Sequence, residues 1–285
     1  MYSALSPGAI GVRASGLNEA IAAAKTGGFG GVEFNPAEIA DLIASHGVAH
    51  VLSLFTDAGV LPAGFGLPLD WRGDEAAWRT SLQKLPRLAE AAQAIGCTRT
   101  MTWIMPCSND REYAENRRFH IERFRPAAEI LADYGCSVGL EFIGPKTLRE
   151  SQRYPFIHTM DGMLEMGSEI GPNVGLLLDC WHWHTSGGTV ADLLRLKPSD
   201  VVYVHVNDAP RGVAMDDYVD NVRGLPGETG AIDIAGFLLS LQTVGYDGPV
   251  TPEPFKTELG DLTSDEARLR TVGDAMRKIF SQAGV

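Results

Sequence analysis

The chain has 285 residues, of which 45% are hydrophobic and 21% are charged. These ordinary globular values exclude a disordered, collagen-like or fibrous chain. A chain of this length can bury a sizeable core, either in two domains or in one α/β barrel of about 250 residues. The formal net charge is −12, from 24 basic and 36 acidic residues, and no run of Lys or Arg occurs. This charge disfavours nucleic acid as a partner.

The cysteines indicate a reducing compartment. Cys97, Cys107, Cys136 and Cys180 form no Cys-x-x-Cys pair, which argues against a zinc ribbon or a disulfide scaffold. We expect all four to be small buried hydrophobic side chains. The first residues lack the basic and apolar regions of a signal peptide, and no later apolar window has the length of about 18 residues that a membrane span needs. We therefore expect a cytoplasmic protein that does not bind a membrane.

Short apolar runs rich in β-branched residues alternate with longer amphipathic stretches along the whole chain. The runs predict strands at Ala9–Ala14, Gly31–Phe34, His50–Phe55, Thr98–Met105, Ser137–Ile143, Val174–Asp179, Val201–Val206 and Gly248–Glu253. The amphipathic stretches predict helices at Leu17–Thr26, Pro36–Ser45, Glu75–Ala94, Glu112–Ala132, Asp161–Ile170, Val190–Leu194, Ile232–Val244 and Ser264–Phe280. Strict alternation repeated eight times predicts a single (β/α)8 TIM barrel, an α/β fold over residues 1–285. A doubly wound open sheet is the competing architecture, but no Gly-x-Gly-x-x-Gly motif follows the first strand.

Two long irregular stretches follow predicted strands. Thr56–Arg72 comes after the third strand and is too long for a passive connection, so we expect it to act as a lid. Asn207–Ala231 comes after the seventh strand and contains Arg-Gly-Leu-Pro-Gly-Glu-Thr-Gly. Both stretches would lie at the carboxyl end of the barrel, where the active sites of this architecture are built.

Four consecutive predicted strands end in polar side chains at that same rim. The fifth, sixth, seventh and eighth strands close with Glu141, Asp179, His205 and Glu253. Three carboxylates and one imidazole that converge at the end of an apolar barrel need a compensating cation. A single strand-end carboxylate is usually a cap or a salt-bridge partner, but four in register predict one divalent metal ion. Three oxygen ligands and one nitrogen ligand suit Mn²⁺, Co²⁺, Mg²⁺ or Zn²⁺.

Other polar and aromatic side chains near these strand ends are candidates for substrate binding. His182 lies just after the sixth strand in the segment Asp-Cys-Trp-His-Trp-His. Trp103 ends the fourth strand and Trp181 follows the sixth, where each serves either substrate stacking or core packing. Lys146 follows the fifth strand and either meets an anionic group or is a solvated loop charge. Glu228 lies in a Pro-Gly-Glu-Thr-Gly turn that would place it at the ligand-binding rim.

Five segments carry a resemblance to a known family. GLEFIG, NVGLLLDCWHWH, VYVHVND, LPGETGAID and GYDGPVTPEPF resemble the xylose-isomerase-like barrel family of sugar isomerases and epimerases, and the pattern is similar to that of inosose isomerases. The resemblance covers most of the chain from Gly135 onward, while the first hundred residues match in outline only. It implies a metal bound at Glu141, Asp179, His205 and Glu253, with the two glutamates as acid and base on either side of the substrate.

The resemblance also implies two residues that hold substrate oxygens. His182 and Arg211 match positions that ketose 3-epimerases use for this purpose. Arg211, six residues after His205, resembles the epimerase branch. The run of Asp179, His182 and His184 resembles the inosose branch instead, so both substrate classes stay open. Members of the family often form dimers or tetramers, which implies a homo-oligomer.

The expected function is that of a divalent-metal-dependent isomerase or epimerase of a small keto-sugar or keto-inositol, acting through a metal-stabilised enediolate. A metal-dependent dehydratase or lyase on such a substrate is the alternative, with Lys146, His158 or His184 as the acid for the departing hydroxyl. An AP endonuclease shares the barrel but needs more histidines after the third, fourth and seventh strands than this chain has. A sugar-binding barrel without catalysis is disfavoured by the intact ligand set.

Overall fold

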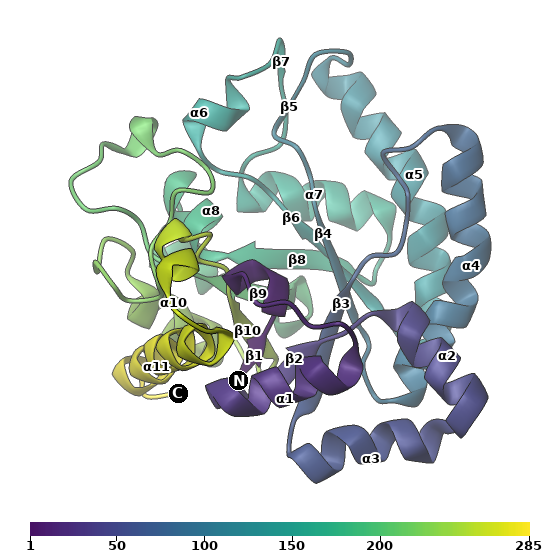
Figure 1. The fold of residues 1–285 in the computed structure, drawn as a ribbon. Helices are drawn as coiled ribbons and strands as arrows, with labels where there is room; N and C mark the ends of the chain where they lie inside the picture. The colour runs from purple at the N-terminus through teal and green to yellow at the C-terminus, as the bar shows by residue number, and fades with distance from the viewer.

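Eight parallel strands close into a barrel inside a ring of helices, in a computed structural model that describes residues 1–285 (Figure 1). The barrel strands are β1 (Tyr2–Leu5), β2 (Gly31–Glu33), β3 (Leu61–Gly66), β4 (Arg99–Trp103), β6 (Ser137–Glu141), β8 (Val174–Asp179), β9 (Val201–Val206) and β10 (Pro249–Pro252). Around the ring the order is β1-β10-β9-β8-β6-β4-β3-β2, so the first strand pairs with the last and closes the barrel. The predicted (β/α)8 barrel is confirmed.

Helices cover the outside of the barrel on all sides. They are α1 (Leu17–Gly27), α2 (Pro36–His46), α3 (Val48–Ala58), α4 (Glu75–Ala94), α5 (Tyr113–Asp133), α6 (Lys146–Arg149), α7 (Met160–Ile170), α8 (Cys180–Thr185), α9 (Val190–Leu193), α10 (Ile234–Thr243) and α11 (Asp265–Ala283). Short 3₁₀ helices are η1 (Pro7–Ile10), η2 (Pro198–Asp200), η3 (Met215–Asp217) and η4 (Thr257–Asp261). An antiparallel pair, β5 (Cys107–Ser108) with β7 (Tyr154–Pro155), stands above the barrel end in Figure 1.

Side-chain caps fix where several of the predicted helices begin. Asn35 accepts a hydrogen bond from the Ala37 backbone N–H at 2.9 Å, at the start of α2. Asp74 does the same for Ala77 at 2.9 Å, at the start of α4. Each cap satisfies one of the backbone donors that a first helical turn leaves free. The predicted start of the third expected helix at Glu75, which is α4 in the structure, is confirmed to the residue.

A small apolar cluster fills the inside of the barrel, separate from the large core between strands and helices. It consists of Ala4, Ala63, Met101, Leu177 and Tyr203. Tyr203 is fully buried and shares a hydrogen bond with the Thr251 hydroxyl at 2.8 Å. Gly64 makes room for it, since a Cβ there would lie 2.6 Å from the tyrosine ring. The Tyr203 ring meets the His205 ring edge-on with centroids 5.7 Å apart, so the cluster forms a packed floor beneath the polar strand ends.

The first strand lies earlier in the chain than predicted. Ala9–Ala14 was expected to be a strand, but β1 is Tyr2–Leu5 and the 3₁₀ helix η1 occupies Pro7–Ile10. Pro7 at the first position of η1 sets the backbone for a helical turn, and Gly11 ends the turn with φ of +72°. The apolar residues of that segment pack as a turn over the barrel.

The third strand and the expected lid are also corrected. His50–Phe55 lies inside the helix α3, where Val51 and Phe55, one helical turn apart, are buried. Thr56–Arg72 contains the end of that helix and all of β3, so it is not a lid. No single helix of the structure is long and apolar enough to cross a membrane, and only the pair α2 and α3, bent by 117°, meets that criterion together.

The second long stretch is irregular, as the sequence predicts. Between β9 and α10 the chain contains only η3 and an isolated bridge between Asp208 and Gly224. The buried Asp208 carboxylate accepts backbone N–H groups of Thr229 at 2.8 Å and Gly230 at 2.7 Å. One buried side chain thus ties the far end of this loop to the carboxyl end of β9.

Candidate metal centre

Four strand-end side chains meet at one point at the carboxyl end of the barrel. Glu141 ends β6, Asp179 ends β8, and His205 lies beside Asp179 in the register of β9. Glu253 follows β10, and its backbone N–H bonds to the Val206 carbonyl at 3.0 Å. One ligand atom from each of the four lies within 4.8 Å of those from the other three. Neighbouring parallel strands thus bring together residues that are far apart in the chain.

Two of the candidate ligand atoms in this cluster lack a hydrogen-bond partner. Glu141 Oε1 and His205 Nδ1 are buried without a hydrogen bond. The His205 Nδ1 atom lies 3.7 Å from Glu141 Oε1 and 3.5 Å from Glu253 Oε2. Buried polar atoms without partners are costly, and lone pairs aimed at a common point are what a metal ion requires. The residues present therefore fit a divalent cation.

Burial and mutual charge shift the acid–base behaviour of the cluster. Burial raises the pKa of Glu141 to about 8, and nearby Glu253 adds to that rise against the pull of His205. Burial likewise raises the pKa of Asp179, although Arg223 opposes it. For Glu253, burial acts upward, but His205 and Arg223 outweigh it and lower the pKa. The two glutamates consequently differ in proton affinity, as acid and base partners do.

Arg223, from the irregular loop after β9, is the site residue that sequence reasoning missed. Its Nη1 donates to Asp179 Oδ2 at 2.8 Å and to Glu253 Oε2 at 3.0 Å, and its Nη2 donates to Asp220 at 2.9 Å. The side chain is only 2% exposed. Burial acts to lower its pKa, but the three carboxylates raise it, so the guanidinium stays charged. Arg223 therefore supplies the positive charge nearest to the acidic cluster.

His182 is held beside Arg223. Its Nδ1 accepts the Gly144 backbone N–H at 3.2 Å, and its Nε2 lies 3.2 Å from Arg223 Nη2. Burial, with the neighbouring Arg223 charge, lowers the pKa of His182 well below its usual value. The imidazole is therefore neutral at physiological pH and lines the pocket in a fixed orientation.

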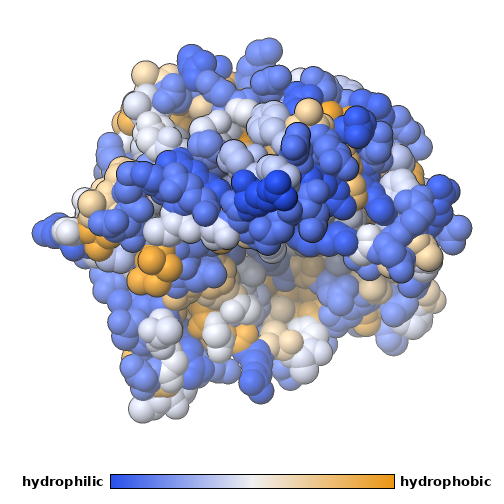
Figure 2. Space-filling view, turned by 90° about the horizontal axis from the view of Figure 1, so that it is seen from above, coloured by the Kyte–Doolittle hydropathy of each residue, from blue (hydrophilic) through white to orange (hydrophobic).

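A cavity of about 840 Å³ opens above the cluster. Glu141, Glu253, His182 and Arg223 form its inner part, and Trp103 belongs to its wall. The space-filling view from above has a hollow near the middle of the face, where hydrophobic residues show beneath a hydrophilic rim (Figure 2). The predicted substrate-binding positions of His182 and Trp103 thus lie in one cavity with the two glutamates.

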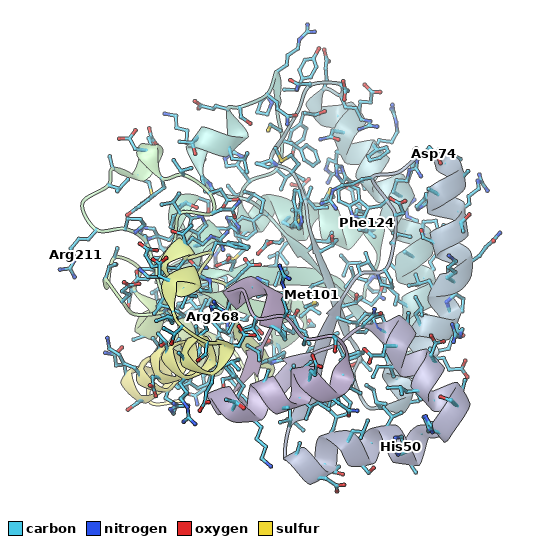
Figure 3. The ribbon with its side chains drawn as sticks, in the orientation of Figure 1. His50, Asp74, Met101, Phe124, Arg211 and Arg268 are labelled. Carbon is cyan, nitrogen blue, oxygen red and sulfur yellow. The ribbon has the colours of Figure 1, made fainter.

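Arg211 lies elsewhere. Its guanidinium donates to the Thr229 carbonyl, and the side chain points outward from the edge of the molecule, away from the barrel (Figure 3). Arg211 is exposed and does not line the cavity. Arg223, from the same loop, lies next to Glu253 instead. The sequence gives only a weak indication of the role of Arg223. Asp220 stands three residues before it, in the loop that follows the strand carrying His205.

The remaining predicted substrate contacts also lie outside the cavity. Trp181 is fully buried and packs on Tyr218, with ring centroids 5.3 Å apart. The His184 ring also packs on Tyr218, with ring centroids 5.8 Å apart. Lys146 pairs with Asp216 at 2.6 Å. Glu228 accepts the Leu225 backbone N–H at 2.8 Å and pairs with Lys256 at 2.9 Å, so it holds the loop together.

Comparison with known proteins identifies the family and the fold. The family model of the xylose isomerase-like TIM barrel matches residues 21–279. An inosose isomerase from Halalkalibacterium halodurans is 27% identical over 73% of this chain and 71% of its own. A xylose isomerase domain protein from Alicyclobacillus acidocaldarius subsp. acidocaldarius is 32% identical, with a TM-score of 0.85 over 99% of both chains. The crystal structure of the IOLI protein with a bound zinc atom is 20% identical, with a TM-score of 0.78 over 99% of both chains, and is similar in fold. Because the family model spans nearly all of the chain, this protein belongs to the xylose isomerase-like TIM barrel family.

Proposed function

We propose that this protein is a divalent-metal-dependent isomerase or epimerase of a small keto-sugar or keto-inositol. The observation that carries the proposal is the cluster of Glu141, Asp179, His205 and Glu253 at the bottom of an open cavity. The relative that is named inosose isomerase supports the substrate class.

The four clustered side chains would hold the ion, and Mn²⁺, Co²⁺, Mg²⁺ and Zn²⁺ all suit three oxygens and one nitrogen. When bound, such an ion supplies Lewis-acid polarisation of a substrate carbonyl. The four free, buried cysteines support the cytoplasmic location that belongs to the same proposal, because thiols persist in a reducing compartment.

Glu253 and Glu141 are the proposed proton-transfer residues. Glu253 is kept ionised by His205 and Arg223, so its carboxylate can take the proton from the carbon next to the carbonyl. Glu141 lines the same cavity as Glu253 and is the proposed group that returns a proton to the other face. Their strands, β6 and β10, are three places apart in the ring, which sets the two carboxyl groups across the barrel mouth. Proton return to the opposite face gives an epimer, and proton return to the adjacent carbon gives an isomer.

Arg223 and His182 are the proposed donors to substrate oxygens, because both face the cavity. The prediction that Arg211 also holds substrate requires the loop between β9 and α10 to move. The dehydratase alternative needs an acid for the departing hydroxyl. Lys146 is engaged by Asp216, and His158 Nδ1 bonds to the Phe156 carbonyl at 3.0 Å, so neither stands ready in the cavity. We therefore favour proton return over elimination.

The test combines metal content with proton exchange in heavy water. With added metal ion, an inosose or keto-sugar should exchange the proton next to its carbonyl and yield an isomer without loss of water. The double variant Asp179→Asn/His205→Gln should lose both the metal and the exchange. The double variant Asp57→Asn/His50→Gln, the same changes at exposed positions of α3, should keep both. Equal metal content in the two double variants would contradict the proposed centre, and a dehydrated main product would favour the lyase.

A further inference from the structure

The cavity is larger than the proposed substrates. It measures about 840 Å³, near the upper end of the range of about 300–1,000 Å³ for pockets that bury drug-sized molecules. A free keto-sugar or inosose, with about a dozen non-hydrogen atoms, is much smaller than such a molecule. With its carbonyl next to Glu141 and Glu253, a single ring would occupy only the inner part of the cavity.

Large apolar and aromatic side chains belong to the wall of the cavity beside its polar residues. They include Ile10, Trp103, Met105, Phe255 and Leu259. Trp103 is 45% exposed and Phe255 is 39% exposed, which places both among the large hydrophobic residues that the protein leaves uncovered. Trp103 ends β4 and Phe255 follows β10, and these strands are four places apart in the ring of eight, so the two residues flank the mouth from opposite sides. We call the space between them the outer subsite.

Trp103 is held in place although it is exposed. It pairs in register with Glu141 on the neighbouring strand, at the edge of the inner site. The Arg72 guanidinium lies 4.0 Å from the indole centroid, and its Nη2 donates to the Trp103 carbonyl at 2.7 Å. A cation stacked on the indole and tied to its backbone fixes the ring without burying it.

Phe255 is held at the opposite side by its backbone. It lies two residues after Glu253 with φ of +39°, a strained conformation for a bulky residue. Arg223 lies 4.9 Å from the centroid of its ring. Strain of this kind persists where the surrounding structure imposes it, often at ligand-binding sites. Here it accompanies an aromatic ring at the mouth, joined through Arg223 to the acidic cluster.

The cations of the outer cavity are already engaged. Lys256 pairs with Glu228 at 2.9 Å. Arg268, which lies near the middle of the molecule in Figure 3, donates to the Leu259 carbonyl at 2.7 Å and pairs with Asp265. A phosphate would need free donors in this region, whereas flat aromatic faces suit the C–H or π face of a second ring.

We propose that the outer subsite binds a second ring, so that the substrate is a keto-sugar in glycosidic linkage rather than a free or phosphorylated monosaccharide. This inference rests on the proposed function for the inner site. The ring in the outer subsite is either a sugar or an aromatic aglycone, since both offer a flat face to Trp103 and Phe255.

Calorimetry with unreactive analogues tests the outer subsite without turnover. With the metal-supplemented protein, phenyl β-D-glucoside or cellobiose should bind at least tenfold more tightly than D-glucose, and D-glucose 6-phosphate should gain nothing. The glycoside that binds better identifies the ring as aromatic or sugar. D-Glucose binding as tightly as both glycosides, or a preference for D-glucose 6-phosphate, would overturn the proposal.

Variants locate the effect. Trp103→Ala and Phe255→Ala should each remove most of the preference for a second ring, measured as the ratio of glycoside affinity to D-glucose affinity. Trp103→Phe should keep it, which separates loss of the ring from loss of the fold. Tyr113→Ala is the matched control, because Tyr113 is an aromatic residue 49% exposed outside the cavity. A preference that survives both alanine variants contradicts the assignment.

Proton exchange with the 3-keto forms of the same compounds separates this inference from the proposed function. Proton exchange that is at least tenfold more efficient for the keto-glycosides than for 3-keto-glucose supports both the outer subsite and the proposed function. Equal exchange for free and glycosidic ketones retains the proposed function and rejects the outer subsite. Absence of exchange with these ketones and with an inosose rejects the proposed function, and the calorimetric ring preference then decides the outer subsite alone.

Discussion

The strands β6, β8, β9 and β10 end in side chains that meet at one point, whereas the strands β1 to β4 end in residues that pack or form a wall. The second group closes with Leu5, Glu33, Gly66 and Trp103, of which only Glu33 is ionisable. The half of the barrel from β6 onward therefore carries the candidate chemistry. The half up to α5 contributes Ile10, Trp103 and Met105 to the cavity wall but none of the four clustered residues. One closed sheet can thus confine the proposed chemistry to one half while both halves share the binding wall.

Glu33 tests this division between the two halves, because it is the only ionisable residue that ends a strand in the half up to α5. It is intermediate in exposure, its Oε1 has no hydrogen-bond partner, and burial raises its pKa against the attraction of His205. It therefore interacts electrostatically with the acidic cluster although it belongs to the other half.

The largest effect is expected in the half that carries the cluster. Glu253→Gln keeps the shape of the side chain but removes the base, so kcat should fall by about 10²–10⁴-fold, and by more if metal is also lost. Glu141→Gln should behave similarly. Steady-state kinetics and metal content measure both effects, and Glu266→Gln, on the exposed face of α11, is the control. Near-normal turnover in a metal-containing Glu253→Gln protein would remove this residue from the mechanism.

Removal of the Arg223 guanidinium, which belongs to the same half, should mainly reduce the stability of the fold. Arg223→Ala leaves the buried Asp179 and Glu253 without their nearest positive charge. Breaking such a buried pair typically costs about 3–5 kcal/mol, so the metal-free variant should unfold at a lower denaturant concentration. Added divalent ion should restore part of this loss, because it neutralises the same carboxylates. A variant as stable as the parent without metal would mean that Arg223 does not compensate the cluster.

The other half should show its own pH dependence, centred on His120. This side chain stacks on Phe156, with ring centroids 5.1 Å apart, and its Nδ1 bonds to the Asn116 carbonyl at 2.7 Å. Burial lowers its pKa to about 4, from an ordinary 6.5. Above pH 6.5 the ring is neutral in both the folded and the unfolded chain, and stability is unaffected.

As the pH falls from 6.5 toward 4, only the unfolded chain gains this proton, so the free energy of unfolding decreases. The loss approaches about 3 kcal/mol and levels off below the folded pKa. Denaturant unfolding between pH 7 and pH 4 measures it. His120→Phe should lack this part of the acid dependence, while His50→Gln at an exposed position should retain it. An identical acid dependence in His120→Phe and the parent contradicts the assignment.

The smallest effect is expected for Glu33→Gln. The amide resembles the neutral carboxyl that burial favours, so kcat should change by less than about tenfold. A loss of about a hundredfold, comparable to that of Glu253→Gln, would mean that the chemistry extends into the other half and that the division described above fails.

Sequence reasoning is most accurate for the strands in the half of the barrel from β6 onward. The bounds of β8 and β9 are as predicted, because each is a continuous apolar run closed by polar residues. The strand β3, with the sequence Leu-Pro-Ala-Gly-Phe-Gly, was missed since Pro and Gly have poor strand propensity. The preceding α3 is equally apolar and was mistaken for a strand. Val51 and Phe55 of α3 are buried at a helical spacing of four residues. This spacing can be recognised only when it is known which residues of the segment are buried.

The candidate site divides in the same way. Its four strand-end residues could be predicted because the barrel topology fixes where strand ends lie. The position of Arg223 beside Glu253 could not be predicted, because Arg223 belongs to a loop without periodicity. The path of that loop depends on the carboxylate of Asp208 and its backbone contacts, which no spacing in the sequence reveals.

The wide spacing of the four clustered residues has a thermodynamic consequence. Successive members are 38, 26 and 48 residues apart in the chain, so the unfolded polypeptide offers no local chelate, unlike a zinc finger with its close ligand pairs. An ion held by this cluster would bind the folded state almost exclusively. Its binding energy would then appear in full as resistance to unfolding, about 2.7 kcal/mol at a free ion concentration one hundred times the Kd. The melting temperature would therefore report metal occupancy, and ions could be ranked by it before any substrate is known.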